Sequence, residues 1–277
     1  MKSKGVVLGF EEAQIVKDGV VEAEKIRTID AWLDGTDIPR LSGEQIILFL
    51  ASCDNNVELA QDAIGEYYRI KSSTPQLFAE RSVDSDAVRR ALSAGRMCTW
   101  RDESGCAFGY YDIKVDSKSW GLADGLKLMF MAFDCALYDG PPNGLQLLID
   151  TKEITLAIVA KCFYPDLLRT AFKYFLRASP VKLKKIHMFN TFSITRQMIQ
   201  VVRPFMDKKL YEQFVFHPRD LQWEEFYEKY VPRRSLPSDL GGDLPTVDDM
   251  QQQMIDRMVE LGTYYETDEK WIKGLHF

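Results

Sequence analysis

The sequence has few of the residues and patterns on which several large protein classes depend. Its five cysteines are an odd number, scattered along the chain without a Cys-x-x-Cys pair, which argues against a disulfide framework and against a zinc site. Its three histidines show neither the HxxxH nor the HExxH spacing of a metallohydrolase. No apolar run approaches the ~18 to 20 residues that a membrane span needs, and the start of the chain turns acidic before a signal peptide could form. We therefore expect a cytoplasmic protein that binds no metal.

Signatures of nucleotide-binding proteins and of common hydrolases are missing as well. The chain contains no GxGxxG, no GxxxxGK(S/T) and no GxSxG motif. Asp150 closes a predicted strand and His187 lies inside another, but neither has a sequence neighbour that would complete a catalytic group. Cys162 sits in an apolar run, where a thiol is an inert small hydrophobe. We expect a protein that is not an enzyme and has no cofactor, with a hydrolase acting through Asp150 or His187 as the weakest alternative.

The sequence contains enough hydrophobic residues to form a large core. With 277 residues, 46% of them hydrophobic, the chain can bury roughly three quarters of its unfolded surface. Helical patterns cover 15–33, 41–52 and 57–71. Ser42, with Gln45 three residues later, forms a capping box that marks the start of the second helix. The apolar stripes of these helices are incomplete, so we expect them to pack on a larger unit.

Beyond residue 82, short strand-like runs alternate with helical patterns. The predicted strands are 108–113, 145–150, 185–189 and 214–217. This alternation is typical of an α/β fold with a mostly parallel sheet. A breaker rich in Pro and Gly precedes a last helix over 247–261 and a polar tail. We expect three parts: an N-terminal helical domain (1–82), an α/β domain (83–245) and a C-terminal helix with its tail (246–277).

Positive charge is concentrated in one part of an acidic chain. The net charge is -6, yet residues 161–219 contain twelve Lys and Arg residues against three Asp and Glu residues. Six of these cations follow one another on a helix and on the extended segment after it: Arg169, Lys173, Arg177, Lys182, Lys184 and Lys185. Cations gathered on one surface can bind a phosphorylated headgroup. Because the block is local, general nucleic-acid binding is not expected. A solvated face is the alternative interpretation.

The segment 194–205 is a strongly amphipathic helix. Its apolar stripe consists of Ile194, Met198, Val201, Val202 and Phe205. Pro204 near its end favours a bend or a stop, which is a suitable place for a hinge. Such a helix either covers a core or acts as a movable lid over an apolar cavity.

Five segments, taken in order, resemble the CRAL-TRIO family of lipid-binding proteins over about residues 10–262. They are the helical stretch Ile46–Phe78, GLQLLID at 144–150, SPVKLKKIHMFN at 179–190, VVRPFMDKKL at 201–210 and LPSDLGG at 236–242. The resemblance implies a helical N-terminal domain on an α/β domain whose sheet floors a closed apolar cavity. In the family, a helix that matches 191–205 gates that cavity.

Two positions depart from the family pattern. Thr151-Lys152-Glu153 follows Asp150 where the family usually has an acidic-glycine pair, and Asp239-Leu240 replaces a common Glu-Tyr. The cavity wall is therefore expected to differ there. The basic headgroup cradle of the phospholipid-exchanging members is not identifiable, so the resemblance favours an isoprenoid-like ligand over a phospholipid.

The resemblance also implies a function and a site. We expect intracellular binding and transfer of a small hydrophobic lipid, such as tocopherol, a retinoid, a carotenoid or a similar isoprenoid. The expected cavity residues are Phe130, Phe133, Ile149, Ile158, Phe172, Phe175, Met188, Ile194, Met198, Val202 and Phe205. In members that transfer tocopherol, basic residues before the IHxxN strand contact phosphoinositides, and this motif falls on Lys182 and Lys184. The expected partners are thus the lipid and a phosphoinositide-containing membrane, touched transiently. A membrane-recruited lipid-sensing adaptor, or a phospholipid-binding protein without transfer activity, is the alternative.

Overall fold

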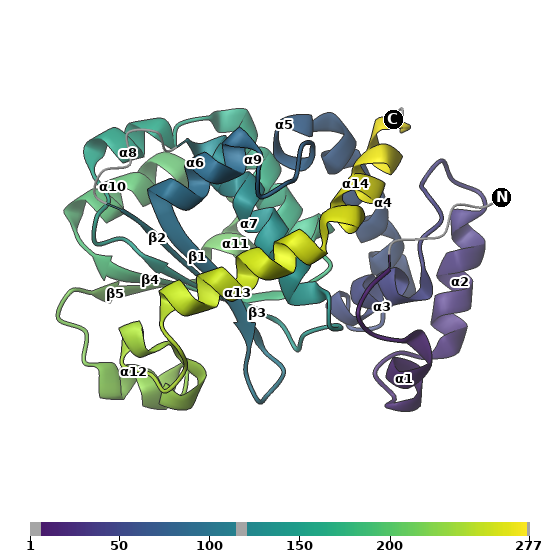
Figure 1. Ribbon diagram of the computed structural model, residues 1–277, viewed down its shortest axis with the longest axis horizontal. Helices are drawn as coiled ribbons and strands as arrows, with labels where there is room; N and C mark the ends of the chain where they lie inside the picture. The colour runs from purple at the N-terminus through teal and green to yellow at the C-terminus, as the bar shows by residue number, and fades with distance from the viewer. Residues whose placement is uncertain (1–6, 115–120, 276–277) are drawn as a thin grey trace.

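A five-stranded mixed sheet forms the centre of the computed structural model, which describes residues 7–114 and 121–275 (Figure 1). Its strands, in both chain order and spatial order, are β1 (Gly95–Arg101), β2 (Ala107–Ile113), β3 (Leu145–Asp150), β4 (Leu183–Thr191) and β5 (Phe214–Pro218). β1 runs antiparallel to β2, whereas β2 to β5 are parallel to one another. The predicted α/β class with a mostly parallel sheet is confirmed, and all four predicted strands are present.

The edge strand β1 is not among the strands predicted from sequence. It joins β2 through a tight hairpin, in which the side chain of Asp102 accepts hydrogen bonds from the backbone N–H groups of Ser104 and Cys106. Gly105 in the same turn has a φ of +78°, which favours glycine. Because β1 begins with glycine and carries two arginines, its apolar alternation is too weak to predict a strand.

Helices account for most of the remaining described residues. In chain order they are α1 (Glu12–Lys17), α2 (Ala23–Leu33), α3 (Gly43–Ser52), α4 (Val57–Ser73), α5 (Pro75–Phe78), α6 (Asp86–Ala94), α7 (Leu122–Leu137), α8 (Leu156–Lys161), α9 (Pro165–Lys173), α10 (Ser193–Val202), α11 (Lys208–Tyr211), α12 (Trp223–Lys229), α13 (Val247–Glu260) and α14 (Gly262–Lys273). The short turns are the π-helical η1 (Tyr174–Ala178) and the 3-10 helices η2 (Arg203–Phe205), η3 (Arg233–Ser235) and η4 (Ser238–Leu240).

Local signals determine where the N-terminal helices begin and end. The Ser42 hydroxyl accepts from the Gln45 backbone N–H, and the Gln45 side-chain oxygen accepts from the Ser42 N–H, so the predicted capping box is confirmed. The prediction of one continuous helix over 15–33 is wrong. The chain breaks between α1 and α2 at Gly19, whose φ of +72° lies outside the helical region.

The two faces of the sheet are covered by different elements (Figure 1). Successive strand residues point to opposite faces, so Tyr111, Ile149 and Met188, which are in register, share one face. That face lies beneath α7, α8, α9 and α10. The residues between them, such as Tyr110 and Leu148, point to the other face and pack with α12 and the segment around η4. The result is a layered α/β structure with helices on both sides of the sheet.

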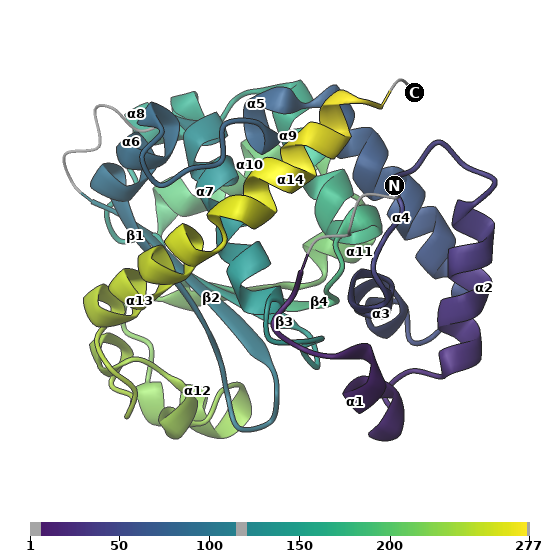
Figure 2. The same cartoon turned by 45° about the vertical axis from the view of Figure 1, so that its right-hand side comes forward.

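The C-terminal helices return to the N-terminal end of the chain (Figure 2). α13, which confirms the predicted helix over 247–261, lies along β1 and α7, and α14 then reaches α4. The Lys71 Nζ on α4 is 2.7 Å from the Asp268 carboxylate on α14, and the Arg81 guanidinium contacts both Asp268 and Asp134. All four side chains are buried. The segment predicted as a polar tail forms the helix α14, and its Asp268 joins a buried ion network that no hydropathy pattern reveals.

Candidate functional site

An apolar cavity of about 210 Å³ lies between the sheet and the helices α7 to α10. Its floor consists of two cross-strand rows of side chains, Tyr111–Ile149–Met188 and Leu147–Ile186–Phe214. Gly109 stands next to Leu147 in the second row and adds no side chain. Mainly aliphatic residues and a glycine on the strands thus leave an unfilled volume, and a cavity lined in this way excludes water.

Helices close the cavity on its other side. The lining residues of α7 are Leu122, Leu126 and Met129, those of α9 are Leu168, Ala171 and Phe172, and those of α10 are Met198, Ile199 and Val202. The first turn of α10 is fixed to the sheet, because the buried hydroxyls of Thr195 and Thr151 lie 3.0 Å apart and Thr151 donates to the Phe189 carbonyl. The other end of α10 runs into η2, which contains Pro204. This arrangement suits a lid that pivots about its first turn, whereas the sequence suggests a hinge at Pro204.

Seven of the eleven cavity residues expected from sequence line this cavity: Ile149, Ile158, Phe172, Phe175, Met188, Met198 and Val202. The other four do not. Phe130 and Phe133 lie in the core under the N-terminal helices, where the Phe130 ring stacks on that of Phe78 at 4.9 Å. Ile194 packs against a small apolar cluster at the start of α10, and the Phe205 ring meets Phe163 at 6.1 Å. The positions of these four side chains depend on how α7 and α10 are rotated about their axes. Helical spacing in the sequence does not determine this rotation.

Several residues that line the cavity were not predicted, although the sequence pattern indicates their position. Leu147 and Ile186 each precede a predicted lining residue by two positions, and residues two apart on a strand share a face. Leu122, Leu126 and Met129 follow the spacing of one helix face. By contrast Phe214 enters the floor through the pairing of β5 with β4, which only the sheet order establishes.

Three titratable side chains of the α/β part, His187, His217 and Cys162, are buried. His187 lies on the sheet face opposite the cavity, where its Nδ1 is 2.9 Å from Nε2 of His217. Burial, with His217 and Lys185 nearby, lowers the pKa of His187 to about 3, and burial lowers that of His217 to about 4. Cys162 does line the cavity, but burial raises the pKa of its thiol to about 11, so it contributes an apolar surface. These observations favour structural roles for all three side chains.

The six cations expected at the membrane divide into two groups. Arg169, Lys173 and Lys182 form ion pairs with carboxylates: Arg169 with Asp166 at 2.9 Å, Lys173 with Glu66, and Lys182 with Asp54 at 2.7 Å. Glu66 and Asp54 belong to the N-terminal helical region, so two of these pairs tie it to the α/β region. Arg177 and Lys184 are exposed, Lys185 is half-buried, and none of the three is ion-paired within the described ranges 7–114 and 121–275.

An exposed apolar patch lies beside the candidate lid. Leu156, Phe163 and Tyr164, on α8 and the connection to α9, are 61%, 54% and 58% exposed. The Phe163 ring contacts Phe205 at the end of the lid, and the Arg169 guanidinium lies 5.0 Å from the same Phe205 ring. Large apolar side chains grouped with cations on one surface are typical of membrane-contacting sites.

Two features that the described residues lack bear on other functions. No group of three or more His, Cys, Asp or Glu side chains in 7–114 and 121–275 could hold a metal ion. Over the same residues, no helix has both the length and the apolar character to cross a bilayer. His276 lies outside the described residues.

Comparison with protein families agrees with this geometry. Residues 98–242, more than half of the chain, match the family model of the CRAL/TRIO domain, and the chain belongs to this family. Its members bind and transfer small lipophilic molecules. The apolar cavity between sheet and helices lies within the matched region.

Individual relatives are distant. Human alpha-tocopherol transfer protein-like is 20% identical over 210 residues, which is 73% of this chain and 59% of that protein. Human clavesin-2 is 22% identical over 196 residues, or 67% of this chain and 57% of that protein. The chain therefore spans less than two thirds of the length of these relatives. The crystal structure of Sfh5 superposes with a TM-score of 0.50 at 12% identity, covering 93% of this chain and 97% of that one, which supports the fold.

Proposed function

We propose that this chain takes up one hydrophobic lipid in the apolar cavity and carries it between membranes. The cavity within the α/β part, residues 83–245, is the observation that carries this proposal. Protein interiors are close-packed, and an unfilled volume of about 210 Å³ costs roughly 5 kcal/mol at ~24 cal/mol per Å³. A bound apolar molecule would fill that volume. The almost entirely apolar wall favours a tocopherol, a retinoid, a carotenoid or a similar isoprenoid over a phospholipid.

Uptake requires the lid to open. Pockets for small-molecule ligands usually occupy ~300 to 1,000 Å³, so the cavity is too small in this conformation for a full-length isoprenoid. α10 supplies three lining residues, and the hydroxyl of Thr195 holds its first turn to Thr151. Outward rotation of its Pro204 end enlarges the cavity and exposes an apolar stripe that water disfavours. A membrane surface would stabilise the open form by binding that stripe.

The surface around the lid is proposed to dock on the membrane. Phe163 and Tyr164 would enter the lipid interface beside Phe205. Arg177 and Lys184, which form no ion pair within the part of the chain that the structure describes, would meet anionic headgroups such as phosphoinositides. Lys173 and Lys182, which carboxylates already neutralise, would contribute less.

The first test asks whether the purified protein holds a lipid. Its mass under native conditions should exceed its denatured mass by one lipid, which an organic extract then identifies. Ala171→Trp, which places an indole in the cavity, should lose this lipid while keeping its circular dichroism spectrum. An empty protein that takes up nothing from a panel of isoprenoids, sterols and fatty acids would refute the proposal.

The second test separates binding from membrane docking. Reversing charge in Arg177→Glu with Lys184→Glu should slow lipid transfer to phosphoinositide vesicles several-fold without changing ligand affinity in solution. Lys17→Glu with Arg27→Glu, on α1 and α2, is the matched control with the same charge change. Equal transfer by the two double variants would contradict docking through the basic surface. Stoichiometric lipid binding without any transfer would favour a membrane-recruited adaptor.

A further inference from the structure

A second, polar pocket adjoins the apolar cavity at the carboxyl ends of β2 and β3. It has a volume of about 490 Å³, and Ile113 and Asp150 line both this pocket and the apolar cavity. Its remaining walls carry charges of both signs, including Arg96, Lys152 and Glu153. Asp150, the last residue of β3, is therefore the charged residue that the two hollows share.

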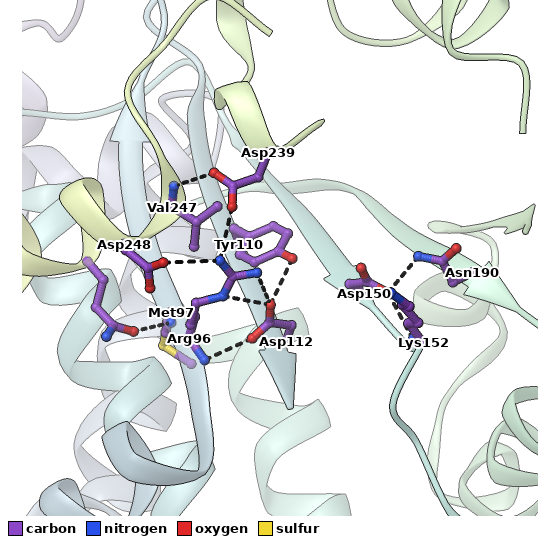
Figure 3. A network of polar contacts seen from close by, with 11 residues as sticks. Arg96, Met97, Tyr110, Asp112, Asp150, Lys152, Asn190, Asp239, Val247 and Asp248 are labelled. Atoms are coloured by element: carbon purple, nitrogen blue, oxygen red, sulfur yellow. Dashed lines mark hydrogen bonds and ion pairs between the residues drawn. The ribbon is translucent and has the colours of Figure 1, made fainter. Parts of the chain in front are cut away.

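The carboxylates of Asp112 and Asp150 differ in how many hydrogen bonds they already accept from the protein (Figure 3). Asp112 and Asp150 are register partners on neighbouring strands. Asp112 is saturated, because it accepts two hydrogen bonds from the Arg96 guanidinium at 2.6 and 2.9 Å, one from the Arg96 N–H at 3.0 Å and one from the Tyr110 hydroxyl at 3.1 Å. Arg96 in turn is held by Asp239 at 3.0 Å and approaches Asp248. This network engages both carboxylate oxygens of Asp112.

Asp150 keeps one oxygen available. Its Oδ1 accepts from the backbone N–H of Lys152 and from the side-chain amide of Asn190, both at 2.8 Å. Asn190 has a φ of +55°, a conformation that asparagine tolerates, and its amide points toward Asp150 at the neighbouring strand end (Figure 3). No described residue donates a hydrogen bond to Oδ2. Two donors thus hold the carboxylate through Oδ1, while Oδ2 accepts from none of the described residues.

We infer that Asp150 selects a lipid that ends in a hydrogen-bond donor, namely a lipophilic alcohol, over the corresponding carboxylic acid. This inference rests on the proposed function, since it assigns a polar end to the ligand of the same cavity. A hydroxyl attached to the apolar body donates to Oδ2 of Asp150, whereas a carboxylate at that place meets a like charge. The cations Lys114 and Lys152 are exposed side chains of the polar pocket and do not border the apolar cavity, so they offset that repulsion only in part.

A matched pair of probes tests the inference. Binding of 1-dodecanol and of dodecanoate is measured at pH 8 by displacement of the neutral fluorophore N-phenyl-1-naphthylamine. The wild-type chain should bind the alcohol at least tenfold more tightly than the acid. Asp150→Asn keeps an acceptor for Lys152 and Asn190 and removes the charge, so it should reduce this ratio to about threefold or less, mainly by tighter binding of dodecanoate. Asp248→Asn, in the polar pocket but away from the junction, should leave the ratio unchanged.

The outcomes separate this inference from the proposed function. Equal affinity for both probes in the wild-type chain, or a ratio that Asp150→Asn leaves unchanged, would overturn the role of Asp150 while leaving a lipid-binding cavity. An equal change in Asp248→Asn would also overturn it, because the general field of the pocket would then be the cause. If neither probe displaces the fluorophore and no lipid is extracted from the purified protein, the proposed function itself fails.

Discussion

The two faces of the sheet are built from alternate residues of the same strands, yet one encloses a cavity and the other is filled. On the filled face, rings from β4 and β5 pack with those of α12: Phe189 lies 5.2 Å from Phe226 and 5.4 Å from Trp223, and His187 stacks on His217 at 5.2 Å. The cavity face carries mainly aliphatic strand residues, with Gly109 among them and Ala171 above. Large flat rings fill the space between sheet and helix, whereas aliphatic and small residues leave a volume that a ligand can occupy.

This difference indicates that the two faces of the sheet have different roles. The filled face supplies the stability that the unfilled face gives up, so the cavity can exist without unfolding the chain. If this interpretation is correct, equivalent substitutions on the two faces should have unequal effects on stability.

The largest expected effect is on the filled face. Phe226 is 1% exposed and its ring contacts those of Phe189, His187 and His217. Phe226→Ala should lower the free energy of unfolding by about 3 to 5 kcal/mol, measured by urea denaturation. Met188→Ala is the matched change on the cavity face, where the side chain already lacks neighbours on one side, and should cost about 2 kcal/mol. Equal losses in the two variants would remove the distinction between the faces.

How far the sequence predicts these faces depends on the kind of signal each residue carries. The strand pattern predicts β3 to the residue, and its alternation places Ile149 on the cavity face. The capping box at Ser42 and the helix over 247–261 are equally local signals. For these elements, the information lies within one turn or one strand of the chain.

Other features depend on contacts between distant segments. Phe130, which the family resemblance places in the cavity, is turned by α7 toward Phe78 and the N-terminal helices. Lys182 belongs to a basic run, yet its neutralisation by Asp54, 128 positions earlier, has no trace in that run. The polar junction at Asp150 likewise requires β2, β3 and the end of β4 to meet. Sequence periodicity predicts which face of a helix or strand is apolar. Which residues that face contacts is determined by the tertiary packing.

A smaller effect is expected when the pH is lowered, and it also arises on the filled face. His187 and His217 have pKa values of about 3 and about 4 in the folded chain, because burial disfavours the charged imidazolium, whereas unfolded histidine has a pKa near 6.5. The unfolded chain therefore binds more protons below that value, and folding stability should fall as the pH is lowered through 6 and 5. The decline is up to about 1.4 kcal/mol per pH unit for each histidine.

A paired measurement isolates this contribution from that of the acidic groups. The free energy of unfolding is measured at pH 7, 6 and 5 for the wild-type chain and for His217→Gln, which keeps a polar partner for His187. The variant should show a slope that is shallower by about 1 kcal/mol per pH unit. Parallel pH profiles would mean that the imidazole pair is not held neutral by the filled face.

The smallest expected effect concerns Gly109 beneath the cavity. A Cβ at this position would lie 3.1 Å from Cδ2 of Leu147, which is tighter than an ordinary contact, but Leu147 lines the cavity and has room to move into it. Gly109→Ala should therefore be tolerated, and the reduced freedom of the unfolded chain should stabilise the fold by about 0.4 to 1 kcal/mol. Gly95→Ala on β1 is the control, because its Cβ would lie 2.2 Å from the backbone oxygen of Asp112, which cannot move aside, and urea denaturation should show a clear loss. If Leu147 moves as expected, Gly109→Ala also reduces the cavity and weakens binding of the neutral fluorophore, so greater stability would accompany lower affinity. A variant that loses stability at Gly109 would show instead that the cavity wall is rigid, and that the space beside Leu147 cannot absorb a single methyl group.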